Sequence, residues 1–243
     1  MQVHRYKTFA ATSFAVARAI ADLVEAKPQL AIGLPTGNSP LAVYRLWADW
    51  QREGKVDFRS IRGFGLDEYL GIPASHPASF ANFLKQQVTI PLGLDPGQVA
   101  VLDGMAPDPA QACLDWEAKL AEMGGLDVVL LGLGTNGHIA FNEPGSPRYS
   151  RTRVAELTPE TRRANAPAFD GDEKAVPTKC LTMGIASLLE AREVFLLALG
   201  SAKAPAVAAM LLGLAGPHVP ASFLQAHPQT QVFLDPTAAV LVG

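Results

Sequence analysis

Two titratable side chains follow a long apolar run in the middle of the chain. Residues 126–144 read LDVVLLGLGTNGHIAFNEP, so the run ends at glycines and leads to His138 and Glu143. An imidazole transfers protons readily near neutral pH. A carboxylate on the same loop can orient the ring and stabilise its cation, as the acid of a catalytic triad does. We therefore regard His138 and Glu143 as candidate catalytic residues; the alternative is a hydrogen-bonded structural histidine.

Another carboxylate, Asp67, follows a second apolar segment, Ile61 to Leu66. If Asp67 is partly desolvated at the edge of a sheet, its pKa would rise toward the range useful for a general base. A capping or turn role is the alternative. Glu68 is a rival for any acid–base role because it is the next residue in the chain.

Two further stretches could hold an anion. A short apolar segment leads into a helix at Pro40 through four small or polar residues: Thr36, Gly37, Asn38 and Ser39. Unpaired amides and the dipole at a helix N-terminus favour negative charge there. Lys203 follows another strand, where it could add a positive charge to a phosphate site or simply be solvated. Both stretches also suit ordinary strand–helix turns.

Other chemistries find little support. The remaining histidines show no metal-ligand spacing with His138, and there is no cysteine cluster, so we expect no metal. The glycines at 132, 134 and 137 match a dinucleotide fingerprint only loosely, and the 36–40 turn is neither a Walker sequence nor GxGxxG. We therefore expect no organic cofactor. The absence of GxSxG argues against a serine nucleophile.

The elements that must position these residues alternate between strands and helices. Strands are predicted at 30–34, 61–66, 99–102, from 126, and at 193–199 and 231–234, with 178–183 extended. Helices are predicted from Thr12 or Ser13 to about 27, at 40–53, 79–88 and 108–123, from 158, from 184, from 203 to 212 and at 222–225. This alternation predicts an α/β fold: a single doubly wound, mostly parallel, Rossmann-like sheet with helices on both faces. Ligands bind beyond the carboxyl ends of such strands.

Composition narrows the class of protein further. The 243 residues suit one domain, 1–243, and their net charge of -3 without a basic stripe argues against nucleic acid as a partner. No apolar window is long enough for a membrane span. The N-terminal pattern is that of an amphipathic helix rather than a signal peptide. Cys113 and Cys180 suit buried thiols in a reducing compartment, so we expect a cytoplasmic protein.

Taken together, these segments resemble the glucosamine-6-phosphate deaminase (isomerase) family. The resemblance covers nearly the whole chain in order: LPTGNSP at 34–40, FGLDEY at 64–69, GLGTNGHIAFNEP at 132–144, LGSAK at 199–203 and SFLQAHP at 222–228. The related 6-phosphogluconolactonases share the fold but typically continue from the histidine with Ser-Leu-Phe-Pro, so residues 141–143 disfavour a lactonase. A non-catalytic sugar-phosphate sensor would be joined to a DNA-binding helix-turn-helix, and no basic segment is present.

The resemblance implies a reaction in which glucosamine 6-phosphate becomes fructose 6-phosphate and ammonia. The His138 position would move the ring-oxygen proton with support from Glu143, and the Asp67 position would transfer a proton from C2 to C1. Asn136 would contact His138. The phosphate would be held by the residues of the two anion stretches: Thr36, Gly37, Asn38, Ser39 and Lys203. A small sugar phosphate is the expected partner, and a homo-oligomer is possible.

Three positions depart from the family pattern. Asn136 stands where Asp is frequent, so it can hydrogen-bond His138 but adds no charge. Pro167 stands where members usually carry a phosphate-binding Arg, so either phosphate affinity falls or Arg148, Arg162 or Arg163 reaches the site. Ala155 stands where allosteric hexameric members carry Lys, so activation by N-acetylglucosamine 6-phosphate is not expected.

Overall fold

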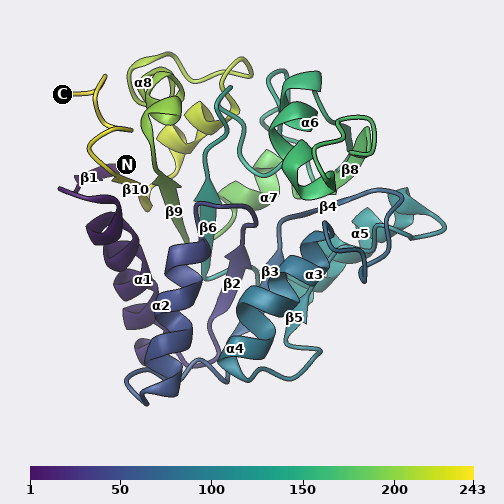
Figure 1. Ribbon diagram of the computed structural model, residues 1–243, viewed down its shortest axis with the longest axis horizontal. Helices are drawn as coiled ribbons and strands as arrows, with labels where there is room; N and C mark the ends of the chain where they lie inside the picture. Colours follow the sequence, from purple (N-terminus) through teal and green to yellow (C-terminus); the bar gives the residue numbers. More distant parts are fainter.

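A seven-stranded parallel sheet forms the centre of the computed structural model, which describes residues 1–243 (Figure 1). Its order is β1-β10-β9-β6-β2-β3-β5, and every neighbouring pair is parallel. The strands are β1 (Gln2–Arg5), β2 (Ala31–Leu34), β3 (Arg62–Gly65), β5 (Val99–Ala100), β6 (Val128–Gly132), β9 (Glu193–Ala198) and β10 (Thr230–Leu234). The predicted parallel α/β sheet is confirmed. The edge strand β1, which has no apolar run, was not predicted.

Helices cover both faces of this sheet. They are α1 (Phe9–Ala26), α2 (Leu41–Arg52), α3 (Phe80–Leu84), α4 (Ile90–Leu92), α5 (Pro109–Glu122), α6 (Pro159–Asn165), α7 (Ile185–Leu189) and α8 (Ala204–Leu212). A π-helical turn, η1 (Lys85–Thr89), follows α3, and three 3₁₀ segments are η2 (Ala166–Phe169), η3 (Ser201–Lys203) and η4 (Pro220–Ala226). No helix combines the length and apolar content needed to cross a membrane.

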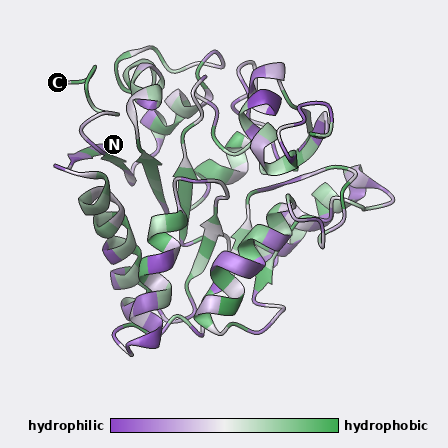
Figure 2. Ribbon diagram, viewed as in Figure 1, coloured by the Kyte–Doolittle hydropathy of each residue, from purple (hydrophilic) through white to green (hydrophobic).

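Strand β6 shows why the sheet must be covered twice. Val128 and Leu130 join the core formed with α1 and α2, whereas Val129 and Leu131 join the core on the opposite face, with α5 and α8. Successive side chains of a strand point to opposite faces, so a continuous apolar run needs a layer on each side. Figure 2 shows the same contrast: the central strands are hydrophobic, whereas α1 and α2 carry polar residues as well.

The first helix begins earlier than predicted. Its N-cap is Thr8, whose Oγ1 accepts a hydrogen bond from Ala11 N at 3.1 Å. The predicted caps, Thr12 and Ser13, are instead buried within α1. The prediction was wrong because it placed the helix start at hydroxyl residues that lie one turn inside the helix. Ser79, by contrast, does cap α3, by accepting from Asn82 N.

A small antiparallel sheet stands beside the main one, and the sequence indicated only part of it. Its order is β4 (Asp67–Tyr69), β8 (Lys179–Thr182) and β7 (Arg153–Glu156). A single residue, Leu66, separates the end of β3 from the start of β4, and Met183 N donates to Leu66 O at 2.8 Å. Strand β7 escaped prediction because its four residues lie in a polar segment without an apolar run. This sheet carries Asp67 away from the main sheet.

Candidate active site

Two glycines shape the loop that follows β6. Gly137 has a φ of 87°, a left-handed conformation that favours glycine. Gly134 lies directly against the His138 ring: a Cβ on Gly134 would stand 2.3 Å from His138 Nδ1. Gly134 N also donates to His138 O at 2.9 Å, which closes the loop. The glycines seen in the sequence therefore let the imidazole pack onto the backbone at the carboxyl end of β6.

Asn136 joins His138 to Glu143. Its Oδ1 lies 2.8 Å from His138 Nδ1, and its Nδ2 donates to Glu143 Oε2 at 2.8 Å. Glu143 Oε2 itself lies 3.5 Å from His138 Nδ1. Both oxygens that face Nδ1 are acceptors, so Nδ1 carries the proton in the neutral ring. Nε2 has no protein partner and is left with a free lone pair, as a proton-transfer group requires.

Glu143 remains ionised despite its burial. Burial by itself would raise its pKa, but hydrogen bonds from His138 and Thr161, the charge of His138 and the Asn136 amide together lower that pKa to about 2. The side chain is only 9% exposed. A fixed anion therefore lies next to the imidazole.

The pKa of Asp67 is shifted in the opposite direction from that of Glu143. It is the first residue of β4, is 8% exposed and has no hydrogen-bond partner for its carboxyl group. Burial, followed by the charge of Glu68, raises the pKa of Asp67 to about 8. A carboxyl group with that pKa is a far stronger base than an ordinary aspartate once it is ionised.

The carboxylate of the neighbouring Glu68 is engaged in hydrogen bonds within the protein. Its carboxylate accepts from Ser79 Oγ at 2.7 Å and from three backbone N–H groups, those of Tyr69, Phe80 and Ala81. It is 1% exposed and holds the start of α3 against β4. Of the two acidic residues that the sequence left as rivals, only Asp67 has a free carboxyl group.

The small sheet brings Asp67 near the His138 loop. Asp67 pairs with Thr182 across β4 and β8, and Thr182 Oγ1 accepts from Phe141 N at 3.1 Å. Asn142 Nδ2 donates to Met183 O at 2.8 Å, one residue further along. The charges of both Asp67 and Glu143 also act on the thiol of Cys180, whose pKa is raised mainly by burial. The two candidate catalytic segments therefore converge on β8.

Arg153 secures the same loop from the other side. It donates to Asn142 Oδ1 at 2.8 Å and to Ser146 Oγ at 3.0 Å, and it has no carboxylate partner. Burial lowers the pKa of this guanidinium. No role for Arg153 was predicted from the sequence, and its role as a brace became visible only in the structure.

The turn that follows β2 contains hydrogen-bond donors that have no acceptor in the protein. Gly37 has a φ of 88°, and the amides of residues 36–39 donate to no protein group. The side chains of Thr36, Asn38 and Ser39 are likewise without partners. Tyr44 Oη donates to Pro35 O at 2.7 Å and so holds the turn onto α2. Free donors at the start of a twelve-residue helix form an arrangement that attracts anions.

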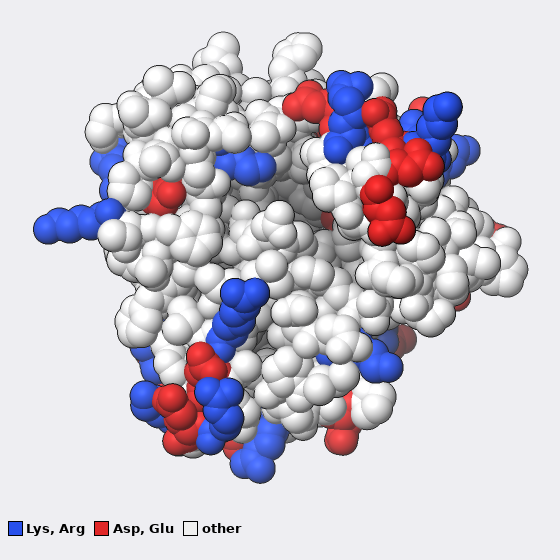
Figure 3. All heavy atoms as spheres, viewed as in Figure 1, with Lys and Arg blue, Asp and Glu red and all other residues white.

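Lys203 is the only lysine or arginine in residues 199–243. It lies at the end of η3, is half-buried and makes no ion pair, and burial lowers the pKa of its ammonium group. An unpaired, partly desolvated cation is ready to bind an anion. Figure 3 shows this face of the molecule hollowed between the regions of α2, α6 and α8, with both basic and acidic side chains near the rim.

The three arginines considered as replacements at Pro167 have other contacts. Arg162 donates to the carbonyls of Glu173 and Val176, at 2.7 and 3.2 Å. Arg163 is exposed and lies 4.0 Å from Glu173, and the Arg148 guanidinium lies over the Tyr149 ring. Pro167 itself is exposed in η2. Arg162 is therefore committed to its loop, whereas Lys203 makes no ion pair and no side-chain hydrogen bond.

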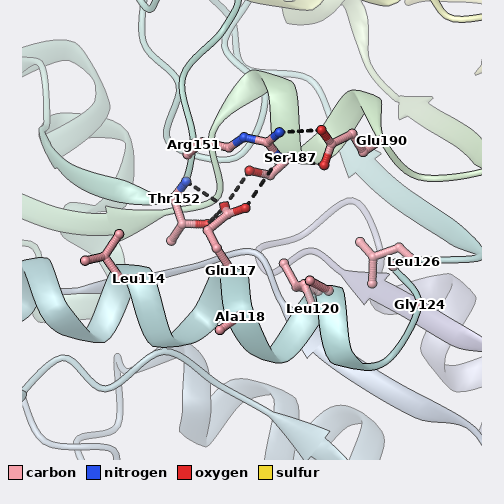
Figure 4. A pocket seen from close by; sticks show the side chains of 12 residues that line it. Leu114, Glu117, Ala118, Leu120, Gly124, Leu126, Arg151, Thr152, Ser187 and Glu190 are labelled. Atoms are coloured by element: carbon pink, nitrogen blue, oxygen red, sulfur yellow. Dashed lines mark hydrogen bonds and ion pairs between the residues drawn. The ribbon is translucent and has the colours of Figure 1, made fainter.

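A cavity of about 670 Å³ lies elsewhere, between α5, α7 and the segment before β7 (Figure 4). Glu117 accepts there from Thr152 and Ser187, and Arg151 pairs with Glu190 and Glu117. The polar groups of this cavity thus satisfy one another, and none of the candidate site residues lines it. No group of three or more His, Cys, Asp or Glu side chains is arranged to hold a metal ion.

Fold and site together define an α/β protein that has a histidine–carboxylate cluster at the carboxyl edge of a parallel sheet and, after β2, a turn whose backbone donors are free. A family model described as "Glucosamine-6-phosphate isomerases/6-phosphogluconolactonase" matches residues 6–233. The chain belongs to this family, as its sequence motifs predicted.

Two sequence relatives and two solved structures are similar to this chain. The chain is 46% identical to a glucosamine-6-phosphate deaminase of Mycolicibacterium smegmatis over 92% of this chain and 85% of that protein. It is 44% identical to glucosamine-6-phosphate deaminase 1 of Giardia intestinalis, over 93% and 85%. A solved structure of a monomeric glucosamine-6-phosphate deaminase has a TM-score of 0.96 at 35% identity and covers 99% of this chain. A 6-phosphogluconolactonase from Trypanosoma brucei shares the fold, with a TM-score of 0.80 at 22% identity.

Proposed function

We propose that this protein converts glucosamine 6-phosphate and water into fructose 6-phosphate and ammonia. One observation carries the proposal. The segment of Asp67, a buried carboxyl group whose pKa is raised to about 8, meets the loop of His138, whose Nδ1 faces Asn136 and Glu143. Removing a proton from carbon needs a strong, desolvated base, and opening a sugar ring needs a proton shuttle. The names of the relatives at 43–46% identity support the same activity.

Binding begins with the phosphate. The free amides and hydroxyls of residues 36–39, with the unpaired Lys203, form a complementary environment for a phosphate dianion. The phosphate lies far from the carbons that react, so its binding energy serves to place C1 and C2 beside the proton-transfer groups.

Ring opening falls to His138. In the neutral ring Nε2 has the free lone pair, so it accepts the proton of the anomeric hydroxyl and returns it to the ring oxygen, which leaves an open-chain aldehyde at C1. The imidazole is positively charged between these two steps. The anionic Glu143, 3.5 Å from Nδ1, stabilises that charge, and Asn136 keeps the ring oriented.

Isomerisation and loss of ammonia then use Asp67. Its ionised carboxylate removes the proton from C2 and returns it to C1, while a proton of the substrate's C2 ammonium group passes to the C1 oxygen. This leaves a hydroxyl group at C1 and an iminium group at C2. Water adds to C2 and the C–N bond breaks, so ammonia leaves and fructose 6-phosphate remains. This net use of water places the enzyme among the hydrolases.

An assay for released ammonia tests the proposal. The folded protein is incubated with the 6-phosphates of glucosamine, galactosamine and mannosamine, and with a 6-phosphogluconolactone as the control for a lactonase. We expect ammonia from glucosamine 6-phosphate and no lactone hydrolysis above the uncatalysed rate. Absence of ammonia with all three amino sugars would contradict the proposal, and lactone hydrolysis would replace it.

We also propose that residues 1–243 form one domain in the cytoplasm. The small sheet supports a single domain, because β4 continues directly from β3 and β8 returns to pair with it. Both cysteines are free and buried, which supports a reducing compartment. The possible homo-oligomer stays a prediction, which a measurement of mass in solution would test.

A further inference from the structure

The second oxygen of Glu143 has partners that the reaction outlined above does not use. While Oε2 faces Asn136 and His138, Oε1 accepts from Thr158 Oγ1 at 3.2 Å. The hydroxyl of Thr161 lies 3.2 Å from that of Thr158 and contributes a hydrogen bond that lowers the pKa of Glu143. The carboxylate is thus held at both ends, by the His138 loop and by the start of α6.

Thr158 also caps α6. Its Oγ1 accepts from Thr161 N at 3.2 Å. A hydroxyl has a single proton to donate, and an ionised carboxylate is a better acceptor than another hydroxyl. The proton of Thr158 therefore goes to Glu143, while a lone pair serves the helix. One side chain fixes both the first turn of α6 and the catalytic carboxylate.

A separate contact joins the same two segments. Thr135 Oγ1 donates to Glu160 Oε1 at 3.0 Å, so the residue next to Asn136 is tied to the first turn of α6. Buried Leu157 precedes the cap and anchors it in the small core that contains Phe141. The start of α6 is therefore docked on the His138 loop by polar and apolar contacts together.

We propose that Thr158 is a positioning residue that orients Glu143 toward His138. A glutamate has three side-chain torsions, and contact through Oε2 alone leaves the carboxylate free to rotate. The Thr158 hydroxyl, which donates to Oε1 at 3.2 Å, restricts that rotation beside Thr161 and keeps Oε2 facing the imidazole. As a statement about catalysis this rests on the proposed deaminase function, whereas the geometry it describes can be measured without turnover.

The main variant is Thr158→Val, which keeps the branched shape and removes the donor. We expect kcat to fall about tenfold, with KM changed less than about twofold, since the lost contact is a hydrogen bond to a charged group remote from the phosphate. Thr158→Ser retains the hydroxyl and should restore kcat to within about twofold of the wild type. An active Thr158→Val enzyme with unchanged kcat would overturn the proposal.

Loss of a helix cap needs its own control. Thr8 caps α1 in the same manner, through Ala11 N at 3.1 Å, and contacts no candidate site residue. Thr8→Val should therefore leave kcat unchanged. Thr158→Asp provides a variant that keeps a capping oxygen on α6 but places a like charge beside Glu143. It should reduce kcat at least as much as Thr158→Val. Retained kcat in Thr158→Asp would also overturn the proposal.

A spectroscopic measurement separates this inference from the proposed function. The ¹⁵N shifts of the His138 ring report how Nδ1 is hydrogen-bonded, whether or not the protein turns over a substrate. We expect them to change in Thr158→Val and Thr158→Asp and to stay unchanged in Thr158→Ser and Thr8→Val. If the wild type releases no ammonia, the proposed function fails, but the ¹⁵N shifts still test whether Thr158 orients Glu143 toward His138. Identical His138 shifts in all variants would overturn the proposal.

Discussion

Asp67 and Glu143 are both buried, at 8% and 7% exposure, yet their pKa values lie on opposite sides of neutrality. Asp67, at the start of β4, has no hydrogen-bond partner, and burial raises its pKa to about 8. Glu143, on the loop after β6, meets His138, Asn136 and hydroxyl donors that lower its pKa to about 2. For these two buried carboxyl groups, the absence or presence of hydrogen-bond partners thus accompanies a raised or a lowered pKa.

The largest expected effect comes from Asp67→Asn. Loss of the base should reduce kcat by about 10³-fold or more, while binding of inorganic phosphate is retained. Steady-state kinetics and phosphate titration measure the two effects. Turnover near the wild-type rate would remove Asp67 from the role of base.

The same substitution should stabilise the fold. The folded-state pKa of Asp67 is raised, so its contribution to stability is complete below the unfolded pKa and is lost as pH rises through about 8. Asp67→Asn abolishes that loss, and we expect its free energy of unfolding at pH 9 to exceed that of the wild type by on the order of 2 kcal/mol.

Asp127→Asn is the matched control for that stability measurement. Asp127 is a buried carboxylate with Lys27 and Arg192 as ion-pair partners, which help to lower its pKa. Removing its charge should therefore destabilise the protein. Urea unfolding of the wild type and the two variants at pH 6 and pH 9 measures both changes in the free energy of unfolding. Stabilisation by Asp127→Asn would contradict the view that ion-pair partners distinguish Asp127 from Asp67.

Glu143→Gln should have the next largest effect. The amide keeps the size of the side chain but removes the negative charge next to the imidazole, so the positively charged His138 is less stable during ring opening. We expect kcat to fall about 10²-fold, with little change in KM. Glu156→Gln, at an exposed glutamate of β7 without a partner, is the matched control and should retain full activity. A fully active Glu143→Gln enzyme would show that the anion is dispensable.

The pH profile tests the two pKa values directly. Asp67 must be ionised to act as a base, so kcat/KM should rise with pH, about tenfold per unit below pH 8, and level off above it. Glu143 should add no ionisation in the neutral range because its pKa lies near 2. A profile that is flat from pH 6 to pH 9 would contradict the raised pKa of Asp67.

The smallest effect is expected at Lys203, which stands outside the pair of carboxyl groups. Lys203→Met should raise KM about tenfold and leave kcat within about threefold, because the lost charge contacts the phosphate and not the reacting carbons. Competitive inhibition by inorganic phosphate should weaken in parallel. An effect on kcat alone would indicate that Lys203 acts in the chemistry.

Several features of this protein follow from its sequence alone. Apolar runs that end in glycines or polar turns indicate six of the seven parallel strands, all except β1. The same runs lead directly to Asp67, to His138 and to the turn at 36–39. Local chemistry is enough for these features, since each run and its turn are adjacent in the chain. The motif around His138 was also specific enough to indicate the family.

Tertiary structure decided which of these groups are free and which are engaged. The carboxylate of Glu68 is engaged by donors at the start of α3, and the guanidinium of Arg162 is engaged by carbonyls of its own loop. The carboxyl group of Asp67 has no partner. The small sheet and the Thr158 contact with Glu143 were not predictable from local pattern, because they join polar segments through residues distant in the chain. Protonation states depend on such contacts, and they therefore belong to the fold rather than to any one motif.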